Sequence, residues 1–370
     1  MALPAHCQKI VFFGLLLSSA VIKAENKVVP GPRSFRFHLN EDNQTLDETV
    51  KNYLTGSITT MMIPVILSII VIIGLPANGL ALLILVTKVQ RLPSTIFLMN
   101  LATADLLLIL VLPFKIHYHF QGNNWIFGEA LCRTMTAFFY GNMYCSILLL
   151  TVISVDRYFA LVHPFYSKGF RDNRFAVAVC FVIWVLVGSF MIPLLLEKQV
   201  YSFQNPNITT CHNVLPAKVD SGYFLYFFLC LVAVGFLIPC AVTVFCYVSI
   251  VRALLKSSDQ FGQAVRNMVL VLITYVVCFA PSNIILLIHH SGHFTNLYQS
   301  YTISLMLGTL NNCIDPFIYY YVSDEFRNKA RSVILSLTKK GKKSIKVTQP
   351  LIESGSSSAP ESKATSEHTI

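Results

Sequence analysis

Two acidic residues stand out because each lies inside a long apolar run. Asp105 closes the run NLATAD, and Asp315 lies in NNCIDPFIY. Charged side chains in such surroundings are costly and usually serve a function. Their carboxyl groups are able to share a proton, to bind a cation, or to accept hydrogen bonds in a network with Asn78, Ser146 and Asn311. The alternative is a satisfied polar network that only specifies helix packing.

A second chemical feature is the basic segment VPGPRSFRFHLN at positions 29–40. Trypsin-fold proteases need Arg or Lys before the cut, because that side chain pairs with an Asp in their specificity pocket. Pro32 in front of Arg33 also suits the narrow apolar cleft of thrombin. The segment is therefore a candidate cleavage site for thrombin or a trypsin-like serine protease, unless the Pro-Arg pair is incidental.

A cut after Arg33 would create an amino terminus that is tethered to the rest of the chain. About 20 residues would join it to the first apolar run, so its binding would be intramolecular, at a millimolar effective concentration. The released end would present an ammonium, an aromatic anchor and a cation. Its candidate ligand residues are Ser34, Phe35, Arg36, Phe37, His38 and Leu39.

The sequence does not predict an enzyme. It shows no nucleophile–base pair, no phosphate-binding loop and no metal-type cysteine spacing such as C-x-x-C. Seven of the ten cysteines lie inside apolar runs, where thiols behave as small hydrophobes. Only Cys132 and Cys211 sit at segment edges where an oxidising compartment could pair them.

Composition points to lipid as the solvent. Of 370 residues, 54% are hydrophobic and 12% are charged, and the mean hydropathy is +0.61. Globular domains carry about 25% charged residues. The net charge of +10 comes from basic residues in connectors and tail rather than on a polar surface, which argues against nucleic-acid binding.

A membrane-spanning helix needs roughly 20 apolar residues, and seven such runs follow one another. They cover 57–86, 94–120, 132–162, 175–196, 223–254, 263–290 and 298–322. We therefore predict an all-α membrane protein whose seven transmembrane helices form a bundle over 57–322. Transporter-like inverted repeats are not visible.

The ends of the chain predict its orientation. Residues 1–24 have the layout of a signal peptide, and the polar segment 25–56 is interpreted as a flexible extracellular stretch. Basic residues gather at the odd-numbered connectors and in the tail, which places these inside the cell. We expect a multi-pass plasma-membrane protein with its N-terminus outside, and with glycosylation acceptors at Asn43 and Asn207.

The segment after the last span has two parts. Residues 323–337 alternate apolar and basic side chains, which predicts an amphipathic helix on the membrane surface. Residues 338–370 are rich in Ser and Thr and are expected to be disordered. Clustered hydroxyls are also what kinases phosphorylate. The alternative is a plain solvated tail.

Marker residues occur once per run and in order. They are Asn78, Asp105, Asp156-Arg157-Tyr158, Trp184, Pro239 with Tyr247, Pro281, and Asp315-Pro316-x-x-Tyr319. This set resembles the signature of rhodopsin-like G-protein-coupled receptors, over about residues 57–331. The resemblance implies a seven-helix bundle that couples to heterotrimeric G proteins. It also implies that receptor kinases and arrestin bind through the tail.

The same resemblance implies roles for the matched residues. Asp156 would hold Arg157 at rest, beside Tyr158. Release of Arg157 would let it pack with Tyr247 and Tyr319 and would open an inner cleft for a G protein.

Other matched positions form a network within the bundle. Asp105, Ser146, Asn311 and Asp315 match the sodium pocket of that family, with Asp105 as the candidate sodium ligand. Asn78 and Tyr319 extend the network. Phe279 stands where many members have Trp, so an aromatic toggle is expected there.

Longer runs resemble the protease-activated receptor family in particular. They are FQGNNWIFGEALC at 120–132, FYGNMYCS at 139–146, NITTCH at 207–212, FAPSN at 279–283 and DPFIYYY at 315–321. The Ser34-Phe35 start is similar to the tethered agonists of that family. The resemblance implies a receptor activated by cleavage after Arg33. The resemblance does not decide the subtype, because the first two runs are similar to the fourth human member and the middle of the chain is similar to the second.

This family resemblance also implies how the agonist docks. A disulfide bond between Cys132 and Cys211 would pin the second outer loop over the mouth of the bundle. The agonist would then dock beneath this loop, against Tyr140, His212 and Asn213.

Asn213 stands where relatives usually have Asp. The anionic partner of the new ammonium and of Arg36 is therefore open, with Asp220 and Glu197 as the candidates. Two other functions also remain open: a receptor for a soluble peptide or nucleotide, and a cofactor that displays protease and signals little itself. The basic tail with its Ser and Thr clusters argues against the second.

Overall fold

The computed structural model describes residues 35–37, 48–163, 172–204, 207–216, 229–254, 270–290, 298–322, 325–333 and 335. The predicted signal peptide, the residues Arg33, Ser34, His38, Leu39 and Asn43, and the tail from 338 onward lie outside these residues. For Phe35, Arg36 and Phe37 the backbone is described.

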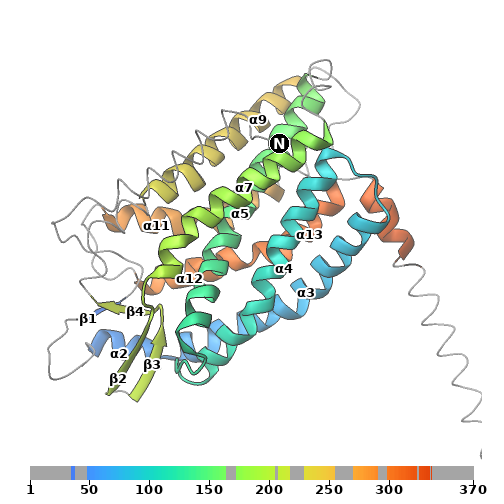
Figure 1. Ribbon diagram of the computed structural model, residues 1–370. Helices are drawn as coiled ribbons and strands as arrows, with labels where there is room; N and C mark the ends of the chain where they lie inside the picture. Colours follow the sequence, from blue (N-terminus) through green and yellow to red (C-terminus); the bar gives the residue numbers. More distant parts are fainter. Residues whose placement is uncertain are drawn as a thin grey trace, which may run out of the picture.

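The described chain is a bundle of long helices. They are α3 (Ile63–Thr87), α4 (Pro93–Phe120), α5 (Gly128–Val162), α7 (Asn173–Leu196), α9 (Ile238–Leu254), α11 (Ala280–His290), α12 (Tyr298–Thr309) and α13 (Asn311–Val322). Figure 1 shows these helices running along one common axis, with the strands gathered at one end. This is the seven-helix architecture predicted from the apolar runs, with one break in the last span.

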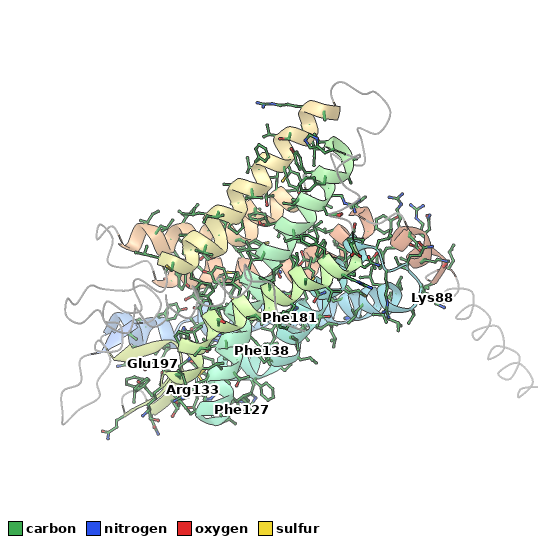
Figure 2. The ribbon with its side chains drawn as sticks, turned by 45° about the horizontal axis from the view of Figure 1, so that its top comes forward. Lys88, Phe127, Arg133, Phe138, Phe181 and Glu197 are labelled. Atoms are coloured by element: carbon green, nitrogen blue, oxygen red, sulfur yellow. A yellow bond between two sulfur atoms is a disulfide. The ribbon has the colours of Figure 1, made fainter. Side chains whose placement is uncertain are left out.

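Six described segments are long and apolar enough to cross a membrane. They are Val50–Thr87, Pro93–Phe120, Gly128–Val162, Asn173–Leu196, Leu229–Ala253 and Leu270–Ile288. Large apolar side chains on their flanks are exposed, such as Ile72 at 71% and Phe181 at 57%; Figure 2 labels Phe181 on the flank of the bundle. A surface of this kind is unfavourable in water and suits hydrocarbon.

The seventh span was expected as one helix over 298–322, and this expectation is wrong in one detail. The helix is interrupted at Leu310, between α12 and α13, which have 12 residues each. Thr309 Oγ1 donates to Met306 O at 2.7 Å, and Asn312 Nδ2 donates to Thr309 O at 2.9 Å. Polar side chains that bond nearby carbonyls compete with the regular ladder and bend a helix.

Two π-helical turns lie just before prolines. η2 (Ala233–Leu237) precedes Pro239, and η3 (Thr274–Phe279) precedes Pro281. Proline lacks the N–H that a regular helix needs, and wider turns of this kind are common at functional sites. A third π turn, η1 (Ile58–Met62), opens the first span and likewise lies just before a proline, Pro64.

Small elements cover the end of the bundle where the strands gather. The strands β2 (Val200–Gln204) and β3 (Asn207–Cys211) form an antiparallel hairpin. Farther along, β4 (Val214–Pro216) pairs in parallel with β1 (Phe35–Phe37), which comes from the far N-terminal part of the chain. Figure 1 shows β1 and β4 next to this hairpin and to the short helix α2 (Glu48–Thr55).

The helix α2 corrects the interpretation of 25–56 as a stretch without regular structure. Val50 and Leu54 lie one turn apart and are buried against Phe203 of β2. Asn123 Nδ2 also donates to Leu54 O. A single pair of apolar residues is too short a pattern to predict a helix from sequence. The helix is stabilised by burial of these residues against Phe203, which comes from a strand far along the chain.

The opposite end of the bundle carries a further helical stretch over residues 325–333. Glu325 accepts hydrogen bonds from the Gln90 backbone N–H at 3.1 Å, and Phe326 packs its buried ring against Tyr319. Figure 2 places Lys88 at this end, away from Glu197 and Arg133. The predicted surface helix over 323–337 thus has its described part in helical form.

Among the described glycines, Gly235 in η2 is the one whose replacement we expect to lower the stability of the protein most. A Cβ at this position would lie 2.6 Å from Cδ1 of Tyr144. We predict that Gly235→Ala destabilises the protein by about 1–3 kcal/mol, since the ring must shift in a packed core. The matched control is Gly188→Ala, because a Cβ at Gly188 meets nothing within 4 Å. Thermal unfolding of the detergent-solubilised protein measures both, and equal melting temperatures for the two variants would contradict the prediction.

Candidate ligand pocket and signalling network

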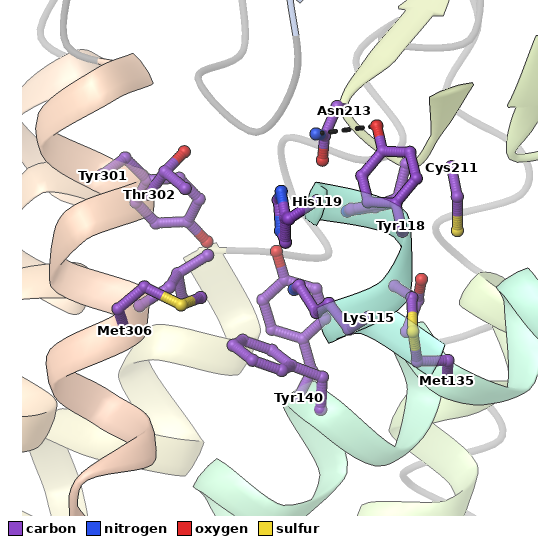
Figure 3. Close-up of a pocket in the computed structure, with 14 residues that line it drawn as sticks. Lys115, Tyr118, His119, Met135, Tyr140, Cys211, Asn213, Tyr301, Thr302 and Met306 are labelled. Carbon is purple, nitrogen blue, oxygen red and sulfur yellow. Dashed lines mark hydrogen bonds between the residues drawn. The ribbon is translucent and has the colours of Figure 1, made fainter. Parts of the chain in front are cut away.

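The outer end of the bundle contains a small cavity beneath the strand region. It is lined by Lys115, Tyr118, His119, Met135, Thr136, Phe139, Tyr140, Cys211, His212, Asn213, Tyr301, Thr302, Leu305 and Met306. Figure 3 shows α12 forming one wall and α4 with α5 forming the other. The volume of about 30 Å³ leaves room for roughly two water molecules.

The three residues predicted to contact an agonist all line this cavity. Tyr140 comes from α5, and its ring lies 5.8 Å from that of His212. His212 adopts a positive φ of 63°, which turns the chain directly after Cys211. Asn213 Nδ2 donates to Tyr118 Oη at 3.1 Å (Figure 3). Of the two candidate acids, Glu197 is exposed and does not line the cavity, and Asp220 lies outside the described residues.

The loop above the cavity is anchored covalently. The structure contains the disulfide bond between Cys132 of α5 and Cys211 of β3 that the family resemblance implied. Trp125 donates its backbone N–H to Thr209 O at 2.6 Å, which ties the α4–α5 connector to the same strand. β3 is therefore held over the bundle at its middle and at its C-terminal end.

A charged clamp holds the other strand of the hairpin. The Glu129 carboxylate accepts the backbone N–H groups of Gln199 at 2.7 Å and Val200 at 3.0 Å. Arg133 pairs with Glu129 at 2.6 Å and donates to Leu196 O at 3.0 Å. On β2, burial raises the pKa of the Tyr201 phenol, and the nearby Glu129 carboxylate adds to the rise. Sequence reasoning missed this clamp because its acceptors and donors are mostly backbone groups.

A polar network crosses the middle of the bundle. Asn142 Nδ2 donates to Asp105 Oδ1 at 3.0 Å, and the Tyr319 hydroxyl lies 3.2 Å from Asp105 Oδ2. The same hydroxyl lies 3.1 Å from Asn78 Oδ1. One network thus joins α3, α4, α5 and α13. Asn142 was missed from sequence, although it lies one turn from Ser146 on the same helix face.

Asp315 and Asn311 lie in the same network. Asn311 Nδ2 lies 3.2 Å from Ser146 Oγ and 3.4 Å from Asp315 Oδ2. Asp315 Oδ1 is buried and accepts no hydrogen bond from the described residues. Two buried carboxyl groups with hydroxyl and amide neighbours are hard oxygen ligands that fit a sodium ion. These residues would hold such an ion and offset its charge.

Phe279 is fully buried in η3, where its ring meets Tyr275 edge-on at 5.9 Å. The Tyr275 hydroxyl donates to Ile147 O at 3.0 Å and bonds with Thr151. The predicted toggle position therefore sits in a wide helical turn whose neighbouring Tyr is bonded to α5. A change in the conformation of this turn would therefore alter the hydrogen bonds between Tyr275 and α5.

The inner end holds the charged pair expected for a resting receptor. Arg157 Nη2 lies 2.9 Å from Asp156 Oδ2. Ser94 Oγ donates to the same carboxylate oxygen at 2.7 Å, and Arg157 also donates to Ser94. Ser94 belongs to α4, whereas Asp156 and Arg157 belong to α5. These three side chains, here called the latch, therefore join two helices. Sequence reasoning missed Ser94 because a serine at a helix start has many ordinary roles.

The tyrosines predicted to receive Arg157 lie elsewhere in this conformation. Tyr247 is bonded to Ser154 at 2.7 Å, and Tyr319 belongs to the central network. Tyr158 packs with His163, whose Nε2 lies 3.0 Å from its hydroxyl. In this conformation Arg157 pairs with Asp156, while Tyr247 and Tyr319 bond to other partners.

Comparison with known proteins agrees with this geometry. Residues 77–319 match the family described as 7 transmembrane receptor (rhodopsin family). The chain is 44% identical to human proteinase-activated receptor 3, over 79% of this chain and 78% of the relative. It belongs to the proteinase-activated receptor family.

Other members are similarly close. Rat proteinase-activated receptor 4 is 43% identical over 82% of this chain and 79% of its own length. Mouse proteinase-activated receptor 2 is 42% identical over 80% of this chain and 76% of its own length. The protein is therefore a multi-pass membrane receptor of a G-protein-coupled family and not an enzyme.

Ser94 offers a test of the latch in this receptor. We predict that Ser94→Ala raises signalling in the absence of agonist about tenfold or more, because a hydrogen bond to a charged group is worth about 1.5–3 kcal/mol. Binding of radiolabelled GTPγS to membranes measures it. The control is Ser189→Ala, since within the described residues Ser189 Oγ donates to Val185 O of its own helix and to no other helix. Unchanged basal binding in Ser94→Ala would show that the latch does not hold the resting state.

Proposed function

We propose that this receptor is switched on by proteolytic cleavage after Arg33. The cut exposes a tethered agonist that begins at Ser34 and Phe35 and docks against the second outer loop. The protease is a trypsin-like serine protease, and Pro32 makes thrombin the first candidate. The N-terminus lies outside the cell at the plasma membrane, and heterotrimeric G proteins bind at the inner end.

The pairing of β1 with β4 carries this proposal. Phe35 lies opposite Val214, and Phe37 lies opposite Pro216. β1 therefore begins two residues after Arg33, and β4 begins directly after Asn213, which with His212 is proposed to contact the agonist. Adding a strand to a free strand edge is a common way to bind an extended peptide.

The position of β4 gives the docked segment a route to the bundle. The disulfide bond of Cys211, at the end of β3 and three residues before β4, ties this part of the loop to α5. The helix α5 also carries Tyr140, Asn142 and Arg157. A displacement of the loop is therefore transmitted along α5 to the central network and to the latch. A ligand that favours the open packing then shifts the population between two states.

Cleavage has a physical reason to matter although the segment lies on β4 in the uncut chain. The cut produces a new ammonium group at Ser34 and frees the end from the preceding residues. Tethering keeps the local concentration of this end in the millimolar range. Modest intrinsic affinity is therefore enough for activation, and the signal is irreversible for each receptor molecule.

Arg33→Gln tests the cleavage step. We predict that this variant does not respond to thrombin, because Gln has no charge for the specificity pocket. It should still respond to the free peptide Ser-Phe-Arg-Phe-His-Leu-Asn, since the docking surface is intact. Calcium release in transfected cells reports both. A normal thrombin response in the variant contradicts the proposal, and a peptide response without any thrombin response in the wild type favours a soluble-peptide receptor.

The β4 edge allows a second test. Replacing Val214 and Leu215 together by proline removes the amide donors next to Pro216, so β4 can no longer donate to a docked strand. We predict a loss of peptide potency of about tenfold or more, since each backbone hydrogen bond is worth about 0.5–1.5 kcal/mol. The matched control replaces both residues by alanine, which keeps the amides. Cell-surface labelling confirms expression, and equal potencies for the two double variants would argue against strand pairing.

A further inference from the structure

We propose that the outer cavity is a binding site for a small aromatic 2-hydroxy acid, with Lys115 binding the carboxylate and His119 Nε2 accepting a hydrogen bond from the hydroxyl group. The inference does not depend on the tethered-agonist proposal, because it concerns a site that is present in the uncut chain.

Lys115 is a cation without an acid among the described residues. It lies near the outer end of α4 and lines the cavity. Its Nζ sits 3.9 Å above the ring of Phe139. The described salt bridges join Arg133 to Glu129 and Arg157 to Asp156, and none of the cavity-lining residues is acidic. Lys115 is half-buried, so it is only partly solvated and favours a partner of opposite sign, which can enter through the cavity.

His119 supplies the second group. It lies four residues after Lys115, so the two side chains share one face of α4. Asn123 donates its amide N–H to Leu54 O, so its oxygen faces His119 Nδ1 at 2.7 Å and Nδ1 carries the hydrogen. The other nitrogen, Nε2, is then an acceptor. It is buried, with no hydrogen-bond partner in the described part of the chain, on a side chain that is 2% exposed.

A cationic donor beside a neutral acceptor defines the ligand chemistry. The complement is an anionic acceptor next to an O–H donor, which is the pattern of a 2-hydroxy acid. One ammonium matches a single negative charge, so a monocarboxylate fits better than a phosphate dianion. Both polar groups of the ligand would be satisfied in a site that is largely closed to water.

The walls select an aromatic substituent. Tyr140 and Tyr301 are almost fully buried, and Met306 lies beside them (Figure 3). Aromatic rings pack favourably against such rings and against methionine sulfur. The cavity of about 30 Å³ holds about two water molecules, so the flexible Met306 and Met135 side chains must move aside to admit the ligand.

Three small molecules test the proposal on the purified, uncut receptor. Mandelate carries the carboxylate, the hydroxyl and the ring; mandelamide lacks the charge; and phenylacetate lacks the hydroxyl. Ligand that binds the folded state raises the melting temperature with concentration. We expect apparent binding of mandelate to be about tenfold or more tighter than that of mandelamide, and several-fold tighter than that of phenylacetate.

Lys115→Gln is the decisive variant, and exposed Lys88→Gln at the opposite end is its control. Lys115→Gln should weaken mandelate to the level of mandelamide, whereas Lys88→Gln should leave the ranking unchanged. If Lys115→Gln fails to fold, the ranking of the three probes on the wild type decides alone. Equal binding of mandelate and mandelamide, or full mandelate binding by a folded Lys115→Gln, overturns the proposal. The Arg33→Gln result bears on neither outcome.

Discussion

The bundle is organised around the hydrogen bonds of the buried Asp105 carboxyl group. In hydrocarbon no water is available to solvate it, so its hydrogen bonds must come from neighbouring helices. Asn142 and Tyr319 provide them, and Tyr319 leads on to Asn78. Asn78 in turn donates at 2.7 Å to Asn312 O. That carbonyl is left free because Pro316, four residues later, has no N–H to offer it.

The outer end follows a different constraint. Its strands are too short to be stable alone, so they are fixed from outside by the Cys132–Cys211 bond and by the carboxylate of Glu129. The helix α2 adds an apolar contact through Leu54. With the loop held in this way, the edge of β4 stays in a defined place above the cavity. A rigid edge lowers the ordering cost that a docking strand would otherwise meet.

The predictions that succeeded rest on long or charged patterns. Seven apolar runs dictated the number of spans, because bilayer thickness sets a length that few other structures require. The carboxylates of Asp105 and Asp315 were recognisable for the same reason, since a charge in an apolar run has few explanations. The break at Leu310 was not predicted, because Thr309 and Asn312 reveal their backbone bonds only once the helix geometry is known.

The amino-acid sequence by itself determined the membrane bundle, the polar centre and the Pro-Arg segment, since each follows from composition or from a short local motif. The tertiary structure alone decided which distant groups meet. It brought Ser94 to the Asp156–Arg157 latch, and it set Lys115 and His119 around one cavity. It also aligned β1 with β4, which lie far apart along the chain. Such meetings depend on how helices pack and where loops are pinned, and no local pattern of residues encodes them.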